Sequence, residues 1–208
     1  MTLVQILDFA SVFVFALTGA LTASRAQLDL VGFFFIGCLT GVGGGTVRDV
    51  VLNRDFVFWI ADPSYIFVGC AAALLVFFTA PLLENRRSAI RWLDALALAV
   101  AVPAGIAVAL DHNVSWPIII IMGMVTGSVG GIARDVVCNE VPWVLKDGEL
   151  YVSAAFAAGC AFMAATMLGL SEITATLICG AVAICLRAGA IQFGWQLPHY
   201  KPRPPREK

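Results

Sequence analysis

The residues most able to do chemistry lie in two stretches of fourteen residues, each with glycines ahead of an adjacent arginine and aspartate. Residues 40–53 read TGVGGGTVRDVVLN, and residues 126–139 read TGSVGGIARDVVCN. Both stretches lie within apolar runs, where an arginine costs at least about 2.5 kcal/mol in a bilayer and usually faces a polar interior. Because each glycine costs about 1 kcal/mol relative to alanine within a helix, the clustered glycines predict a helix break. Broken helices expose carbonyls and amides that bind ions or small polar solutes.

The candidate site residues fall into two sets. The residues predicted to kink the helices and line an ion path are Gly41, Gly43, Gly44, Gly45, Gly127, Gly130 and Gly131. The residues predicted to form a gating charge network are Arg48, Asp49, Arg134, Asp135, Asp8, Asp94 and Arg187. The pairing within this network stays open, because neighbours in a helix point about 100° apart and need not pair with each other. Two simpler interpretations also stand: glycines that let helices pack closely, and arginines that reach the interface or lock onto aspartates.

The two stretches belong to an internal repeat that covers most of the chain. With a shift of 86 residues, nine of their fourteen positions are identical. The same shift pairs further residues outside the motifs, which are Asp8 with Asp94, Gly19 with Gly105, Gly37 with Gly123 and Tyr65 with Tyr151. These matches predict a first repeat over residues 5–83 and a second over residues 91–168.

The composition is that of an integral membrane protein. The chain has 208 residues, of which 60% are hydrophobic and 13% charged, whereas soluble domains have roughly 25% charged residues. Stretches of about 20 apolar residues predict seven helical spans in a single membrane domain over 1–208. They are residues 5–24, 30–53, 64–83, 92–110, 115–138, 150–168 and 172–193. Tyr65 and Tyr151 begin two spans and Trp143 lies near the end of another, so interfacial anchoring is their first interpretation.

The distribution of basic residues predicts the topology. With seven spans, one side carries a single basic residue, Arg54, and the other carries Arg25, Arg86, Arg87, Arg91, Lys146, Lys201, Arg203, Arg206 and Lys208. Because Lys and Arg collect in cytoplasmic loops, we expect the N-terminus outside, the C-terminus inside and a cytoplasmic tail at residues 197–208. Three spans per repeat then force the second copy to insert upside down, with span 172–193 left over. Arg48 is predicted toward the external face and Arg134 toward the cytoplasmic face, with the glycine breaks meeting between them.

Several functions are excluded by the residues present. The six cysteines lie in apolar runs without CxxC spacing, and the chain has only two histidines, so neither a metal site nor another cofactor is expected. No nucleophile and base come together as an enzyme would need. Outside the tail there is no basic stripe for nucleic acid.

The doubled glycine–Arg–Asp signature, at residues 43–49 and 130–135, resembles the bacterial UPF0126 family and its homologues, the trimeric intracellular cation (TRIC) channels. The resemblance extends over essentially the whole chain. It implies a homotrimer in the bacterial inner membrane, in contact with lipids, some of them possible bound ligands. It also implies that each protomer has its own pore for K⁺, and also Na⁺, lined by the second and fifth spans. Val129 stands where the first copy has Gly43, which puts equal kinking of the two spans in doubt.

One rival function from another class stays open. Half-helix amides beside an arginine suit a carboxylate, so a secondary transporter for a small zwitterion such as glycine is the alternative to a channel. The absence of an obvious second ion site favours the channel.

Overall fold

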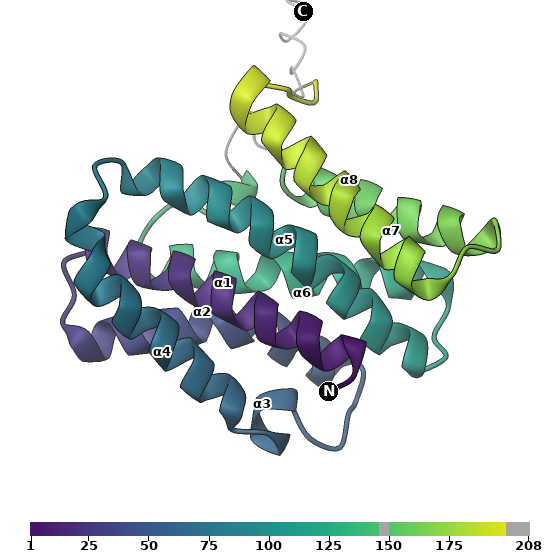
Figure 1. Ribbon diagram of the computed structural model, residues 1–208, viewed down its shortest axis with the longest axis horizontal. Helices are drawn as coiled ribbons and strands as arrows, with labels where there is room; N and C mark the ends of the chain where they lie inside the picture. The colour runs from purple at the N-terminus through teal and green to yellow at the C-terminus, as the bar shows by residue number, and fades with distance from the viewer. Residues whose placement is uncertain (146–149, 199–208) are drawn as a thin grey trace, which may run out of the picture.

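The structure is a computed structural model that describes residues 1–145 and 150–198. Its described residues are helical and turn segments, as predicted (Figure 1). The α-helices are α1 (Leu3–Arg25), α2 (Leu30–Val51), α3 (Phe58–Ala61), α4 (Ser64–Thr79), α5 (Arg86–Asp111), α6 (Trp116–Val137), α7 (Val152–Met167) and α8 (Glu172–Phe193). Two 3₁₀ turns, η1 (Ala80–Leu82) and η2 (Trp143–Leu145), follow α4 and α6.

The long helices coincide with the predicted spans to within a few residues, except that α5 begins at Arg86, six residues before the predicted span 92–110. Six are long and apolar enough to cross a membrane, with α4 and η1 counted together, and α7 is a shorter apolar helix of 16 residues. The all-helical membrane fold is therefore confirmed, while seven full crossings and the side on which each end lies stay predictions. Lys146 and residues 199–208, most of the predicted cytoplasmic tail, lie outside the described residues.

The repeated asparagine of the two motifs ends a helix in each copy. Asn53 and Asn139 follow α2 and α6 with φ of 52° and 54°, a left-handed conformation that asparagine tolerates at helix ends. The next amides turn back, from Arg54 N to Asp49 O at 3.0 Å and from Glu140 N to Asp135 O at 2.8 Å. These caps place the motif aspartates in the last turn of each helix, close to the loop that follows.

The glycines bring α2 and α6 into direct contact instead of breaking them. Both helices are continuous through their glycines, so the predicted helix break was wrong. A Cβ on Gly44 would collide with the carbonyl oxygen of Thr126, and one on Gly130 with that of Thr40. Because the contacts pair the later residue of one helix with the earlier residue of the other, α2 and α6 cross antiparallel. Close packing through small residues is the usual basis of such contacts in membranes.

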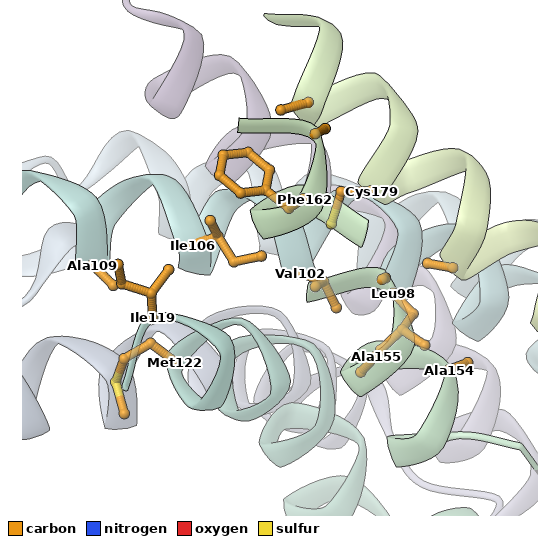
Figure 2. Close-up of a cluster of buried hydrophobic side chains, with 14 of the residues drawn as sticks. Leu98, Val102, Ile106, Ala109, Ile119, Met122, Ala154, Ala155, Phe162 and Cys179 are labelled. Carbon is orange, nitrogen blue, oxygen red and sulfur yellow. The ribbon is translucent and has the colours of Figure 1, made fainter. Parts of the chain in front are cut away.

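The helix outside the repeat, α8, packs against the second repeat. Its small side chains Cys179 and Ala183 are buried in one cluster with Leu98 of α5 and Phe162 of α7. Figure 2 shows the centre of this cluster, where Val102, Leu98, Phe162 and Cys179 converge from three helices. The first repeat has its own, smaller cluster between α1, α2 and α4, which includes Leu21 and Phe33. This packing brings α8, and Arg187 on it, beside α5 and α7 of the second repeat.

Candidate functional site

A buried charge cluster lies where the start of α1 meets the end of α2, and we call it the Asp8 end. Arg48 is fully buried. Its Nε donates to Asp49 Oδ1 at 2.7 Å, and its Nη1 donates to Asp8 Oδ1 at 2.9 Å. A second arginine, Arg54, reaches the same Asp49 oxygen at 3.2 Å. One arginine thus holds two carboxylates from two helices, and a second arginine approaches from the following loop.

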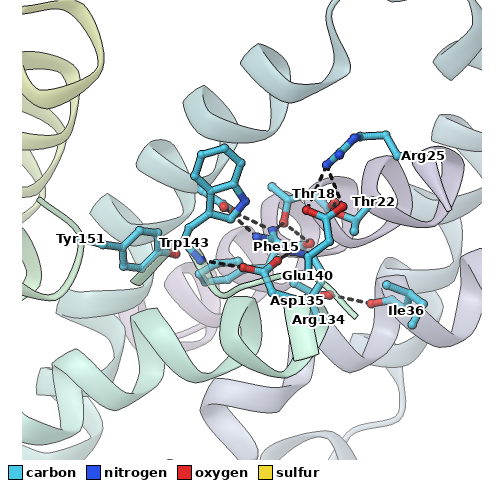
Figure 3. Close-up of polar contacts among 12 residues, drawn as sticks. Phe15, Thr18, Thr22, Arg25, Ile36, Arg134, Asp135, Glu140, Trp143 and Tyr151 are labelled. Carbon is cyan, nitrogen blue, oxygen red and sulfur yellow. Dashed lines mark hydrogen bonds and ion pairs between the residues drawn. The ribbon is translucent and has the colours of Figure 1, made fainter. Parts of the chain in front are cut away.

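The second repeat builds the same cluster at what we call the Asp94 end (Figure 3). Arg134 donates from Nε to Asp135 Oδ1 at 2.8 Å and from its two Nη atoms to both oxygens of Asp94 at 2.8 and 3.0 Å. Thr18 of α1 adds a further contact, accepting from Arg134 Nη1 at 2.8 Å. The pairing that the sequence left open is therefore repeated, with each arginine held by its neighbour and by the aspartate 40 residues earlier.

Each motif aspartate joins its arginine to the following loop. Asp49 uses Oδ1 for Arg48 and Oδ2 to accept from the backbone amide of Phe58 at 2.8 Å. Asp135 does the same with the amide of Trp143 at 3.0 Å. Because these carboxylates satisfy both an arginine and a loop amide, a movement of the loop would disturb the charge cluster.

The two clusters lie at different levels of the bundle. Helix α1 contacts both: its Asp8 binds Arg48, and its Thr18 binds Arg134. Ten residues separate these positions, which is about 15 Å along a helix. The crossing of Gly44 and Gly130 lies between the clusters, since each arginine follows its glycine by four residues in antiparallel helices. This is the mirrored arrangement that the inverted repeat predicted.

The remaining predicted glycines contact the walls of the crossing. A Cβ on Gly41 would lie 2.9 Å from the Val12 carbonyl oxygen, and one on Gly45 would lie 2.6 Å from the Phe58 ring. Gly43 faces Gly130, Gly127 faces Leu98 and Val102, and Gly131 faces Tyr151. In this conformation all of these glycines pack against neighbouring residues.

The surroundings of the two clusters differ. Arg187, the remaining predicted charge, is buried at the Asp94 end with its guanidinium carbon 4.8 Å from the centre of the Tyr151 ring. At the Asp8 end, Arg54 is 34% exposed, and a cavity of about 470 Å³ reaches Asp8 between α1, α3 and α4. The Asp8 end is therefore open to a cavity, whereas the described cluster residues at the Asp94 end, Arg134, Asp94 and Asp135, are buried.

Some interpretations from the sequence were wrong and some partners were missed. Tyr65, Tyr151 and Trp143 are buried beside the clusters and are not interfacial anchors. Both motif arginines are also too deeply buried to reach the interface themselves. No pattern in the sequence indicated that Thr18 contacts Arg134, because a threonine in an apolar helix is common and its partner lies 116 residues away. Among the described residues, no three His, Cys, Asp or Glu side chains gather as a metal-binding group.

Known proteins share this sequence pattern along the whole chain. A family model described as "Glycine transporter" matches twice, over residues 5–81 and 91–167, with the same offset of 86 residues as the internal repeat. A UPF0126 membrane protein of Vibrio cholerae is 36% identical over 204 residues, which cover 96% of this chain and 83% of that protein. The UPF0126 inner membrane protein YadS of Escherichia coli is 34% identical over 203 residues, with 95% and 96% covered.

Solved structures share the fold. The TRIC trimeric intracellular cation channel orthologue from Rhodobacter sphaeroides superposes with a TM-score of 0.90 at 37% identity, over 94% of this chain and all of that one. A second TRIC cation channel structure gives a TM-score of 0.85 at 25% identity, over 98% of this chain and all of that one.

Proposed function

Because the chain belongs to the UPF0126 family of multi-pass bacterial inner-membrane proteins, we propose that it is a cation channel. The observation that carries this proposal is the match, over nearly the whole chain at 37% identity, to a trimeric intracellular cation channel orthologue. The relatives are membrane proteins, and the chain is not an enzyme.

We propose K⁺, and also Na⁺, as the permeant ions, on a path along the crossing of α2 and α6. The arginines beside this path do not oppose cation entry, because each lies between two aspartates. Arg48 contacts Asp8 and Asp49, and Arg134 contacts Asp94 and Asp135. Each trio thus carries one net negative charge. The glycine contacts close the crossing in this conformation, so conduction requires α2 and α6 to move apart.

We propose that the chain assembles with itself as a homotrimer in which each protomer conducts. Large apolar side chains are exposed on the surface of the bundle, such as Phe35 on α2 and Phe67 and Phe78 on α4, at 59%, 73% and 69%. Surfaces of this kind meet lipids and neighbouring protomers. Light scattering of the purified protein, corrected for bound detergent, gives the number of chains and tests this proposal.

Planar bilayer recording tests the channel. We expect discrete current steps in KCl, with a reversal potential that moves toward the K⁺ equilibrium potential in a KCl gradient. Arg48→Lys and Arg134→Lys keep the charge but lose the planar fork that holds two carboxylates. Both variants should change the open probability more than the unitary conductance. Unaltered gating in both would contradict a gating role for the clusters.

One observation favours a second candidate, a secondary transporter for a small zwitterion such as glycine. The cavity at the Asp8 end presents both the guanidinium of Arg54 and carboxylates, which suit the two charges of a zwitterion. Saturable uptake of labelled glycine into proteoliposomes, without unitary current, would support the transporter and reject the channel.

A further inference from the structure

The short helix α3 is fastened to α2 over the Asp8 end, near the start of α1 (Figure 1). Two of the bonds that hold it come from neighbouring residues. The amide of Phe58 donates to Asp49 Oδ2 at 2.8 Å, and the indole Nε1 of Trp59 donates to the hydroxyl oxygen of Thr46 at 2.9 Å. Because Thr46 and Asp49 lie about one turn apart on α2, the two bonds fix both the position and the orientation of α3.

The ring of Phe58 lies between the cavity at the Asp8 end and the glycine crossing. Phe58 lines the cavity of about 470 Å³. Its ring also fills the space beside Gly45, where a Cβ would lie 2.6 Å from the ring atom Cε1. Phe58 is 7% exposed, and its ring packs edge-on against Tyr65 at 4.7 Å between ring centres. The ring therefore separates the cavity from the crossing.

The second repeat has the same amide contact without an aromatic ring against its glycine. The amide of Trp143 bonds to its motif aspartate as that of Phe58 does, but the Trp143 ring lies beside Arg91, 5.0 Å from the guanidinium carbon to the ring centre. Gly131 is the counterpart of Gly45. Within the described residues, a Cβ on Gly131 would meet nothing closer than the Tyr151 hydroxyl oxygen at 3.5 Å.

The bond from Trp59 to Thr46 also lacks an equivalent in the second repeat. With the offset of 86 residues, Ile132 stands in place of Thr46 and Leu145 in place of Trp59. Neither of these side chains can donate or accept a hydrogen bond. The charge cluster is thus built without this bond in the second repeat, so the bond serves something particular to the Asp8 end.

We propose that α3 is a gate at the Asp8 end, with the Phe58 ring as its plug and the bond from Trp59 to Thr46 as its latch. The proposal rests on the proposed channel function, since it names the element that controls entry to the same path. With the latch closed, the ring blocks the way from the cavity to Gly45. With the latch open, α3 swings away from α2 and the cavity joins the crossing.

This movement leaves the charge cluster paired. Asp49 loses the amide of Phe58 but keeps its bond to Arg48, at 2.7 Å, because both of these residues lie on α2. Arg48 also keeps Asp8 of α1. The lost hydrogen bonds are replaced by water from the adjacent cavity, which makes the net cost of opening small. The gate therefore opens without leaving a buried charge alone.

Planar bilayer recording of Phe58→Ala tests the plug. Without the ring the cavity extends to Gly45, and we expect the open probability to rise more than fivefold. Phe56→Ala is the matched control, because Phe56 lies two residues earlier in the same loop, is 66% exposed and does not line this cavity. Its open probability should equal that of the wild type.

Trp59→Phe tests the latch with the plug in place, and it decides the matter if Phe58→Ala does not fold. Phenylalanine keeps an aromatic ring and loses the indole N–H. We expect the open probability to rise roughly fivefold, the factor that corresponds to one net hydrogen bond. Trp116→Phe is the control, since Trp116 is 58% exposed at the start of α6. An unchanged open probability in Trp59→Phe, or an equal rise in Trp116→Phe, would overturn the proposal.

Hydrogen exchange judges the gate if the wild-type chain conducts no cation, which would defeat the proposed function. The amide of Phe58 is protected by its bond to Asp49 and exchanges when α3 opens. In mass spectrometry, peptides that contain Phe58 should exchange roughly fivefold faster in Trp59→Phe than in the wild type. They should exchange at the wild-type rate in Trp116→Phe. Equal exchange in Trp59→Phe and the wild type would then overturn the gate.

Discussion

The two charge clusters share one design, an arginine held by two aspartates, and differ in what surrounds it. At the Asp94 end the arginine gains a threonine from α1, and Arg187 of α8 covers the neighbouring tyrosine. At the Asp8 end a half-exposed arginine and a cavity take these places. The charge fork is thus the same in both repeats, whereas Arg54 and a cavity surround it at one end and Thr18 and Arg187 surround it at the other. Pairs of matched substitutions can test this contrast.

Removing the central arginine should have the largest effect, and it should be larger at the sealed end. Arg134→Leu leaves Asp94 and Asp135 buried without their partner, which costs about 3–5 kcal/mol of unfolding free energy. Arg48→Leu should cost less, because Arg54 still neutralises Asp49 and the cavity brings water to Asp8. Thermal unfolding in detergent measures both. Equal losses would show that the two ends are equally closed.

A variant that removes all three charges separates lost charge balance from lost packing. In Asp94→Asn with Arg134→Gln and Asp135→Asn, no buried charge is left unpaired. We expect this variant to regain at least half of the stability lost in Arg134→Leu, since most of that loss comes from the unpaired carboxylates.

Alanine at the glycine crossing should have the next largest effect. Gly44→Ala forces a Cβ into the carbonyl of Thr126 and should cost about 1–3 kcal/mol through overpacking. Gly43→Ala is the control, because its Cβ would lie 3.4 Å from the Cα of Gly130, a tight but tolerable contact. Unfolding midpoints of the two variants compare the positions. A larger loss for Gly43→Ala would contradict the crossing geometry.

Removing the hydroxyl of each tyrosine should change the unfolding free energy by different amounts at the two ends, with a smaller difference than the substitutions above. Tyr151→Phe loses the hydrogen bond to the Gly127 carbonyl and should cost about 0.5–1.5 kcal/mol. Tyr65→Phe should leave the stability unchanged, since its hydroxyl has no described partner. Chemical or thermal unfolding compares the two. The expected difference between the two ends would be wrong if Tyr65→Phe lowered the unfolding free energy more than Tyr151→Phe.

The outermost ion pairs should matter least. Arg25 contacts Glu140 at 3.0 Å with both side chains partly exposed, and such pairs contribute about 0.2–1 kcal/mol. Arg25→Gln should therefore lose its effect on stability in 1 M salt. Arg54→Gln should keep part of its effect there, because Asp49 is fully buried. Unfolding at low and high salt distinguishes these outcomes.

Much of the fold followed from the sequence because membrane constraints are strong. Apolar length predicted the helices, and the three spans in each copy of the repeat predicted the inverted arrangement. The glycines were harder to interpret, since a missing side chain permits both a helix break and a close contact. Here the glycines form a close contact between the helices, because the carbonyls of Thr40 and Thr126 lie opposite Gly130 and Gly44.

The partners in the candidate site were only partly predictable. Asp8 and Asp94 were foreseeable, because an intramembrane charge needs a partner and few are available. The loop amides of Phe58 and Trp143 were not, since nothing in a sequence shows which amide meets a carboxylate. The contrast between the two ends also depends on α8, which lies outside the repeat and brings Arg187 to the Asp94 end.

The glycine crossing of α2 and α6 is a point about which the two helices can rock, and the two motif arginines lie close to it. Arg48 and Arg134 each lie four residues, about 6 Å, beyond the glycine at the contact. A rocking of 10° about the pivot would shift each arginine by only about 1 Å, in opposite senses at the two ends. That small stroke is enough to stretch a hydrogen bond of 2.8 Å beyond its useful range. Opening one end and tightening the other would then be a single motion.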